Sequence, residues 1–217
     1  MKHITFYLDF ISPYAYLAFE RLPAALQGLS YQVTYKPVLF AAMLNHYGQL
    51  GPAEIAPKRT WTYRQMLWLA REQGVPMQAP ASHPFNPIGL LRLAVACGKD
   101  GACNRYVAET IFRHVWTTGQ DAGDALRLSE LTARLQPARL VTDLAVKAEL
   151  KSNTDSAIAA QVFGVPSMQV DGDVLWGLDA LPMLRQHLEG DAWFNSADWK
   201  GASGLPVGTR RKSHNEK

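Results

Sequence analysis

The sequence predicts an α/β protein in which a large helical block interrupts a small sheet domain. Two observations support this prediction. Strand and helix patterns alternate over residues 4–38, and a pair of short strands followed by a helix appears after Gly164. Between these two parts, from about residue 40 to 163, the sequence has helical periodicity and almost no strand pattern.

The chain opens with a strand, a helix and a second strand. Residues 4–10 are β-branched and aromatic, which is typical of a buried strand. Ser12 can cap the helix, and Pro13 suits the first helical position because its missing N–H would be unpaired there in any case. The helical pattern ends at Gly28, and residues 32–38 form the next strand. Since a whole helix connects the two strands, we expect them to be parallel.

The middle of the chain predicts helices separated by short connections. The helix candidates are residues 59–73, 87–97, 102–117, 128–135, 137–149 and 153–163. Small polar or acidic residues favour helix starts at Asn86-Pro87, Ser129-Glu130 and Thr154-Asp155. We therefore expect an all-helical block.

The last part of the chain predicts a hairpin and a final helix. Two short strands, 168–170 and 174–176, flank the turn Asp171-Gly172-Asp173. Asp179 then begins a helix that continues to about residue 189. The final 25 or so residues are rich in Gly, Ser and charge, and we expect them to be loose.

Composition excludes several classes of protein. The formal net charge of +3 is too small to indicate nucleic-acid binding, and the basic cluster Arg210, Arg211 and Lys212 is interpreted as a solvated tail rather than a nucleic-acid or membrane patch.

No apolar run approaches the roughly 18 residues that span a membrane, and no signal peptide is visible, so we expect a cytoplasmic protein. Cys97 and Cys103 form no C-x-x-C pair, and the six histidines have no metal-binding spacing, so no metal is expected.

Several short motifs resemble, in order, those of a known family. They are Asp9-Phe10 with Ser12-Pro13-Tyr14, Phe163-Gly164-Val165-Pro166-Ser167, Asp171-Gly172-Asp173, Leu175-Trp176-Gly177, and Asp179 at a helix start. Together they resemble thioredoxin-like proteins of the DsbA type. The sequence is most similar to the 2-hydroxychromene-2-carboxylate isomerase group, which is itself similar to kappa-class glutathione transferases. The segments Lys36-Pro37-Val38 with Asn45, and Ala56-Pro57-Lys58-Arg59 with Tyr63-Arg64, also look like this group.

The resemblance implies a division of the chain. Residues 1–40 and 164–190 would form a thioredoxin-like domain, residues 41–163 a helical insertion with its connecting helix, and residues 191–217 a C-terminal tail. One motif departs from the family, which has Trp-Gly-Asn-Asp-Arg where this chain has Trp176-Gly177-Leu178-Asp179-Ala180. Two polar groups are therefore missing near the expected glutathione site.

Ser12 is the candidate catalytic residue. A helix N-terminus has unpaired N–H groups and about half a positive charge, which stabilise an anion. A serine there cannot perform disulfide chemistry, but it can donate a hydrogen bond to an external thiolate, which the resemblance implies is that of glutathione. A plain N-cap serine is the alternative. A serine nucleophile is a weaker one, because no G-x-S-x-G motif surrounds Ser12.

The resemblance also implies the glutathione contacts. A cis proline at Pro166 would expose the backbone of Val165, which could pair with glutathione as an added strand does. Asp179 would bind the γ-glutamyl ammonium, and N–H groups at the start of that helix, including that of Ala180, would bind its carboxylate. A trans proline at position 166 and a simple cap at position 179 remain open alternatives.

The candidate substrate contacts are four polar residues, Lys36, Asn45, Arg59 and Arg64. Lys36 would bind a substrate carboxylate from the end of the second strand, although it could equally be a solvated lysine. The helix that carries Arg59 and Arg64 could likewise be a solvated face. Trp61, Trp68 and Trp176 are candidates for the wall of an apolar pocket, with a core position as the alternative.

The resemblance implies a glutathione-dependent cis–trans isomerase of 2-hydroxychromene-2-carboxylate or a similar aromatic enone acid. Two alternatives remain: a kappa-like glutathione transferase acting on other electrophiles, and a non-catalytic thioredoxin-like module that binds a peptide. We expect a small aromatic substrate and neither nucleic acid nor membrane as partners. The resemblance also suggests a homodimer.

Overall fold

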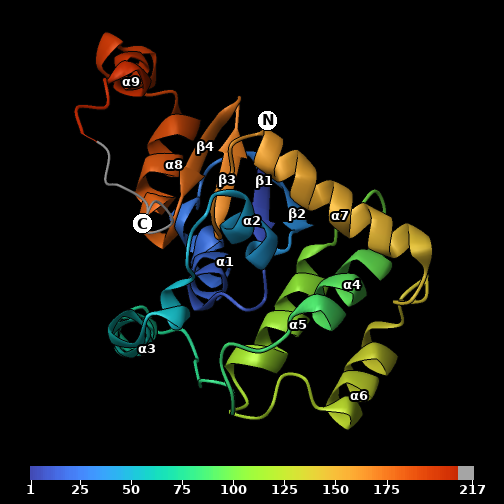
Figure 1. Ribbon diagram of the computed structural model, residues 1–217. Coiled ribbons are helices and arrows are strands. Elements are labelled where there is room, and N and C mark those ends of the chain that lie inside the picture. The colour runs from blue at the N-terminus through green and yellow to red at the C-terminus, as the bar shows by residue number, and fades with distance from the viewer. Residues whose placement is uncertain (210–217) are drawn as a thin grey trace.

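The computed structural model describes residues 1–209 and contains a four-stranded mixed sheet with the order β2-β1-β3-β4 (Figure 1). Strands β1 (Lys2–Leu8) and β2 (Tyr31–Pro37) run parallel in register. Strands β3 (Ser167–Val170) and β4 (Asp173–Trp176) add antiparallel neighbours. The predicted parallel pair and the predicted hairpin are both confirmed.

Helices cover both faces of this sheet. On one face lies α1 (Pro13–Ala25), which packs against α8 (Leu181–Glu189) and α5 (Arg105–Trp116). On the other face lies α7 (Leu144–Ala159), which packs against β2 and against α2 (Phe40–His46) (Figure 1). Strand β1 lies between the two layers, because Ile4, Phe6 and Leu8 belong to the main core whereas Tyr7 joins a smaller cluster with residues of α2 and α7.

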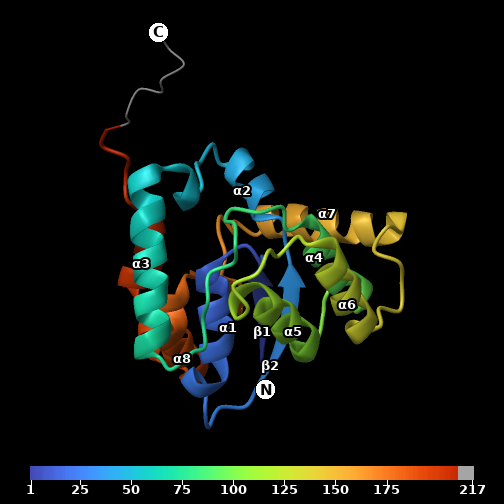
Figure 2. The ribbon, with the colours of Figure 1, turned by 90° about the horizontal axis from the view of Figure 1, so that it is seen from below.

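The remaining helices extend the molecule to one side of the sheet. They are α3 (Ala56–Glu72), α4 (Ile88–Ala96) and α6 (Ala125–Leu135), with a short 3₁₀ turn at Pro52–Glu54 before α3. Helix α3 runs along the edge of the molecule (Figure 2), and of its residues only Met66 and Ala70 are buried. The predicted α/β fold with a large helical block is confirmed.

Two predictions about the helices were wrong, and one helix was missed. Residues 137–149 and 153–163 do not form two helices, because α7 is continuous through Thr154, which is buried in its interior. Helix α6 begins at Ala125 with Asp124 as its cap, before the predicted start at Ser129. Helix α2 was not predicted at all.

The expectation of a loose C-terminal tail was also wrong for its first part. After Gly190 the chain forms a 3₁₀ turn (Ala192–Asn195), α9 (Ala197–Gly201) and a second 3₁₀ turn (Ala202–Gly204). Phe194 is buried there, with its ring centroid 4.8 Å from that of His187 and 5.1 Å from that of Trp199. The predicted basic cluster at 210–212 lies outside the described residues. None of the helices in residues 1–209 has the length and apolar character needed to cross a membrane.

Candidate active site

Ser12 caps α1, as predicted, at the point where the chain leaves β1. Its Oγ accepts a hydrogen bond from the N–H of Ala15 at 3.1 Å, and Pro13 occupies the first helical turn. The side chain is almost fully buried. The Ser12 hydroxyl donates to the carbonyl of Val165 at 3.3 Å, so residues far apart in the sequence meet here.

The Val165–Pro166 peptide bond is cis, as predicted. Pro166 C=O accepts from Gly177 N–H at 3.0 Å, which ties this loop to the end of β4. Within residues 1–209, the N–H of Val165 makes no hydrogen bond. Val165 therefore offers a free backbone donor next to the Ser12 hydroxyl, the arrangement that an extended peptide ligand can pair with.

A cavity of about 910 Å³ opens beside this loop. Three structural parts line it. They are one face of α1, the facing side of α3, and the stretch from the Pro166 loop into α8. Helix α1 contributes Tyr14, Arg21 and Ala25, and α3 with the residue after it contributes Gln65, Leu69 and Gln73. The third part contributes Val165, Pro166, Trp176, Gly177, Leu178, Asp179, Leu181, Pro182 and Arg185. Its size suits a tripeptide together with a second small molecule.

The cavity is apolar along much of its wall but carries two cations. The Tyr14 hydroxyl donates to Gln65 Oε1 at 2.7 Å and so joins α1 to α3 across the cavity. Arg185 is held by the carbonyls of Ala25 and Gln27, at 3.0 and 3.1 Å. Arg21 is half-buried and, within the described residues, makes only a long contact of 3.5 Å with the Gln73 carbonyl. Its guanidinium can therefore bind an anionic group in the cavity.

The structure brings some of the predicted glutathione contacts together. Val165, Pro166 and Asp179 line the cavity. Ser12 is buried and is not among the lining residues, but it donates a hydrogen bond to the carbonyl of Val165, which is. Ala180 is buried immediately before α8, in the 3₁₀ turn Leu178–Ala180. Ala180 is not among the residues that line the cavity, and the predicted roles of all these residues stay predictions.

The four predicted substrate contacts lie elsewhere. Lys36 is half-buried on β2 opposite Tyr7, and Asn45 is exposed on α2. Arg59 and Arg64 are exposed on α3. None of the four lines the cavity.

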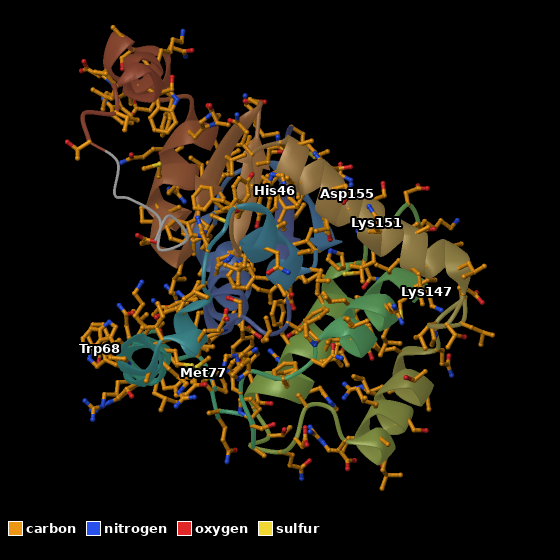
Figure 3. All side chains as sticks on the ribbon, viewed as in Figure 1. His46, Trp68, Met77, Lys147, Lys151 and Asp155 are labelled. Carbon is orange, nitrogen blue, oxygen red and sulfur yellow. The ribbon has the colours of Figure 1, made fainter. Side chains whose placement is uncertain are left out.

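The predicted aromatic wall is only partly present. Trp176 lines the cavity and its ring centroid lies 5.0 Å from that of Phe163. Trp61 and Trp68 instead stand on the outer side of α3, with 63% and 59% of their surfaces exposed; Figure 3 shows Trp68 pointing away from the body of the molecule. These two side chains form neither a wall of this cavity nor part of the core.

Asp9 is a buried carboxylate that the sequence did not single out as a site residue. Its side chain is fully buried, and it accepts hydrogen bonds from Ile11 N–H at 3.1 Å and Phe40 N–H at 3.0 Å. Burial raises its pKa to about 7, and the backbone hydrogen bonds only partly oppose this effect. Asp9 thus joins the turn before Ser12 to the first residue of α2.

Comparison with known protein families identifies this fold. Residues 3–189 match the model of the DsbA-like thioredoxin domain. The chain belongs to the DsbA-like thioredoxin family. This match covers most of the chain, so the predicted thioredoxin-like fold is confirmed.

Individual relatives support the narrower resemblance. The chain is 29% identical over 197 residues to a 2-hydroxychromene-2-carboxylate isomerase of Sphingobium xenophagum, with 86% of this chain and 98% of the relative covered. It is 27% identical over 206 residues to glutathione S-transferase kappa 2 of Caenorhabditis elegans, with 86% and 92% covered. The predicted resemblance to the isomerase group and to kappa-class transferases is confirmed.

A solved structure agrees with the architecture. The fold superimposes on that of a 2-hydroxychromene-2-carboxylate isomerase with a TM-score of 0.74 and 24% identity, covering 90% of this chain and 98% of the other. This likeness supports the DsbA-like thioredoxin architecture.

Proposed function

We propose that this protein is a glutathione-dependent cis–trans isomerase of 2-hydroxychromene-2-carboxylate or of a similar aromatic enone acid. One observation carries the proposal: the Ser12 hydroxyl, at the N-terminus of α1, lies 3.3 Å from the carbonyl of Val165, and the N–H of Val165 makes no hydrogen bond within residues 1–209. An anion site and a peptide-binding edge are thus adjacent. The turn has Ser12 and Ala15 where a redox pair would need two thiols, so the chemistry is not disulfide exchange.

The residues present fit glutathione. Val165 offers a backbone donor and acceptor, and the exposed Asp179 carboxylate lies along the same wall of the cavity. When bound, glutathione would supply a thiolate that adds reversibly to the conjugated carbon, so that the double bond can rotate before the thiolate leaves. No electrons are gained or lost overall.

The protein's part in this reaction is electrostatic. The Ser12 hydroxyl would turn from the Val165 carbonyl to donate to the sulfur anion, supported by the N-terminal dipole of α1. The N–H of Tyr14 in the first helical turn has no partner within the helix and points the same way. Together, these donors would keep the thiol ionised near neutral pH.

The substrate carboxylate needs a cation in the cavity. Arg21 fulfils this requirement best, because it is half-buried in the lining and makes a single long hydrogen bond to residues 1–209. We propose Arg21 as the carboxylate-binding residue in this cavity. Lys36, Asn45, Arg59 and Arg64 stay predictions as substrate contacts.

A second candidate is a kappa-like glutathione transferase acting on another electrophile. Leu178 favours it, because this apolar side chain lines the cavity where the isomerase motif carries an amide. The same thiolate site would serve both reactions, so turnover of an aromatic enone acid compared with that of a general electrophile distinguishes them.

The first test is the titration of glutathione into the protein at neutral pH, followed by calorimetry and by the ultraviolet absorbance of the bound thiolate. Wild type should bind glutathione and show the thiolate band. Ser12→Ala should lose the band and about 10²-fold or more in kcat, as expected for removing a donor to a developing or stabilised anion.

Ser12→Thr is the matched control, because it keeps both the hydroxyl and the cap. It should keep most of the thiolate band. A wild-type protein that does not bind glutathione at several millimolar would contradict the proposal. If Ser12→Ala kept full turnover, the serine would be only a cap; if the protein bound a peptide with no turnover, it would be a binding module.

A further inference from the structure

The peptide groups immediately before Ser12 are held by three side chains, two of which come from distant parts of the chain. Ile11 N–H donates to Asp9 Oδ1 at 3.1 Å, and Ile11 C=O accepts from His83 Nε2 at 2.8 Å. The preceding carbonyl, that of Phe10, accepts from Trp116 Nε1 at 2.9 Å. This stretch is a turn between β1 and α1, so no regular backbone ladder fixes these groups.

The two donors come from the helical block. His83 lies in the connection between α3 and α4, and Trp116 is the last residue of α5. Their rings are adjacent, with centroids 5.5 Å apart. Side chains of the helical block therefore reach the loop of the sheet domain that carries Ser12.

The hydrogen bonds of His83 define its protonation. A carbonyl oxygen only accepts, so Nε2 must carry the hydrogen. Nδ1 lies 2.9 Å from the Tyr63 hydroxyl, which can donate to it when the ring is neutral. Burial lowers the pKa of His83, which agrees with a neutral ring. The same Tyr63 hydroxyl also lies 2.9 Å from the His83 carbonyl, to which its single hydrogen can donate instead.

We propose that His83, with Trp116 beside it, is a positioning residue for the thiolate site at Ser12. Both side chains bind carbonyl oxygens, whose partial negative charges would repel a sulfur anion if they turned toward it. By holding these oxygens away from the site, they leave the Ser12 hydroxyl and the N-terminus of α1 facing the ligand. This inference rests on the proposed function.

Two variants separate positioning from plain structural support. His83→Gln places an amide donor near the position of Nε2 and can still bind the Ile11 carbonyl, whereas His83→Leu removes the donor. In His83→Leu we expect the pKa of bound glutathione to rise and kcat to fall by about 10²-fold, because small displacements of reacting groups have effects of this size. KM should change much less. His83→Gln should stay within a few-fold of wild type.

Tyr63→Phe provides a second route if His83→Leu does not fold. It removes only the hydroxyl that supports Nδ1, so it should produce a smaller rise in thiolate pKa in the same direction. Full thiolate formation and kcat in folded His83→Leu would overturn the inference. So would a His83→Gln protein impaired as strongly as His83→Leu, or, if His83→Leu does not fold, a Tyr63→Phe protein with an unchanged thiolate pKa.

Amide hydrogen exchange, measured without glutathione, tests the positioning role of His83 separately from the proposed function. Failure of wild type to form the thiolate would contradict the function alone. Amide hydrogen exchange of Ile11 and Ser12 would then test the positioning. These amides should exchange faster in His83→Leu than in His83→Gln, while exchange in strand β3 stays equal. Equal exchange at Ile11 and Ser12 in both variants would overturn the positioning role.

Discussion

Asp9 combines complete burial with a place next to the candidate catalytic serine. Its carboxyl group receives two backbone N–H groups, yet burial still raises its pKa to about 7. Desolvation therefore has a larger effect than hydrogen bonding at this position. Because this carboxyl group keeps its proton up to about neutral pH, its contribution to the free energy of unfolding falls as the pH rises. A carboxylate whose pKa is lowered in the folded protein has the opposite effect.

The folded protein binds the Asp9 proton more tightly than the unfolded chain, whose aspartate pKa is about 4. The stabilisation is therefore complete below that value and is lost as the pH rises toward 7. The slope approaches about 1.4 kcal/mol per pH unit between these values. Asp9→Asn should remove this slope. Urea unfolding from pH 5 to pH 8 measures it in both proteins.

The difference between the two proteins isolates Asp9. His83 and His114 both have pKa values lowered by burial, so their contributions to stability fall as the pH decreases. These contributions are common to wild type and Asp9→Asn and cancel in the comparison. Parallel stability curves for the two proteins would show that Asp9 ionises normally.

At the scale of helices and strands, sequence prediction succeeded where the relevant contacts are local. Ser12 caps α1 through the N–H of Ala15, only three residues later. Asp171 and Gly172 both have positive φ values, 50° and 94°, as the predicted hairpin turn requires. Both are short-range features, and both were predicted correctly.

Prediction failed where a helix depends on distant partners. Helix α2 has Leu39 at its cap position, with no side-chain cap of its own. Asp9 instead accepts from Phe40 N–H, and Thr154 Oγ1 accepts from Leu39 N–H at 3.0 Å. These partners are 31 and 115 residues away, so no local pattern indicates this helix.

Distant contacts also account for a wrong prediction, the helix start at Thr154-Asp155. The run Asn153-Thr154-Asp155 suggests a helix start, but in α7 the first two are buried and bind other elements. Asn153 Nδ2 donates to the carbonyls of Pro37 and Gly101, at 3.0 and 2.6 Å. Polar residues in the middle of a helix can thus make tertiary hydrogen bonds, and in the sequence alone they look like residues that cap a helix start.

Thr154→Val tests this contact between α7 and α2. Valine has nearly the shape of threonine but cannot accept from Leu39 N–H, so we expect a loss of about 1–3 kcal/mol in the free energy of unfolding. Thr154→Ser keeps the hydroxyl and is the control for the acceptor. Chemical denaturation measures both. A serine variant less stable than the valine variant would show that packing of the methyl group matters more than the hydrogen bond.

The site follows the same division between local and distant contacts. Ser12, Val165 and Pro166 belong to motifs that the sequence displays, and the structure brings them together. Arg21 and His83 carry no motif, because each acquires its place only when α3 and its following loop pack beside α1. A single histidine or arginine in a helical pattern is indistinguishable from a solvated one until that packing is known.

At the scale of the whole molecule, the sheet domain and the helical block share one core. The ring of Phe112 in α5 lies 4.9 Å from that of Phe10 and 5.2 Å from that of Phe19. Trp116 is also fully buried at this junction. The division into residues 1–40 with 164–190 and residues 41–163 stays a prediction, but this shared core leads us to expect that the two parts unfold together.

Phe112→Ala tests that expectation. Truncating a fully buried phenylalanine should cost about 3–5 kcal/mol. If the two parts form one cooperative unit, hydrogen exchange should lose protection by the same factor in β1 and in α5, although only α5 carries the change. Tyr106→Ala, at a half-exposed position of the same helix, should alter neither segment by more than about 0.5 kcal/mol. Loss of protection confined to the helices would mean that the block opens on its own while the sheet and the turn before Ser12 stay folded. In that case, the support that His83 and Trp116 give to that turn would be lost at each opening, and thiolate formation would fall with the population of the closed block.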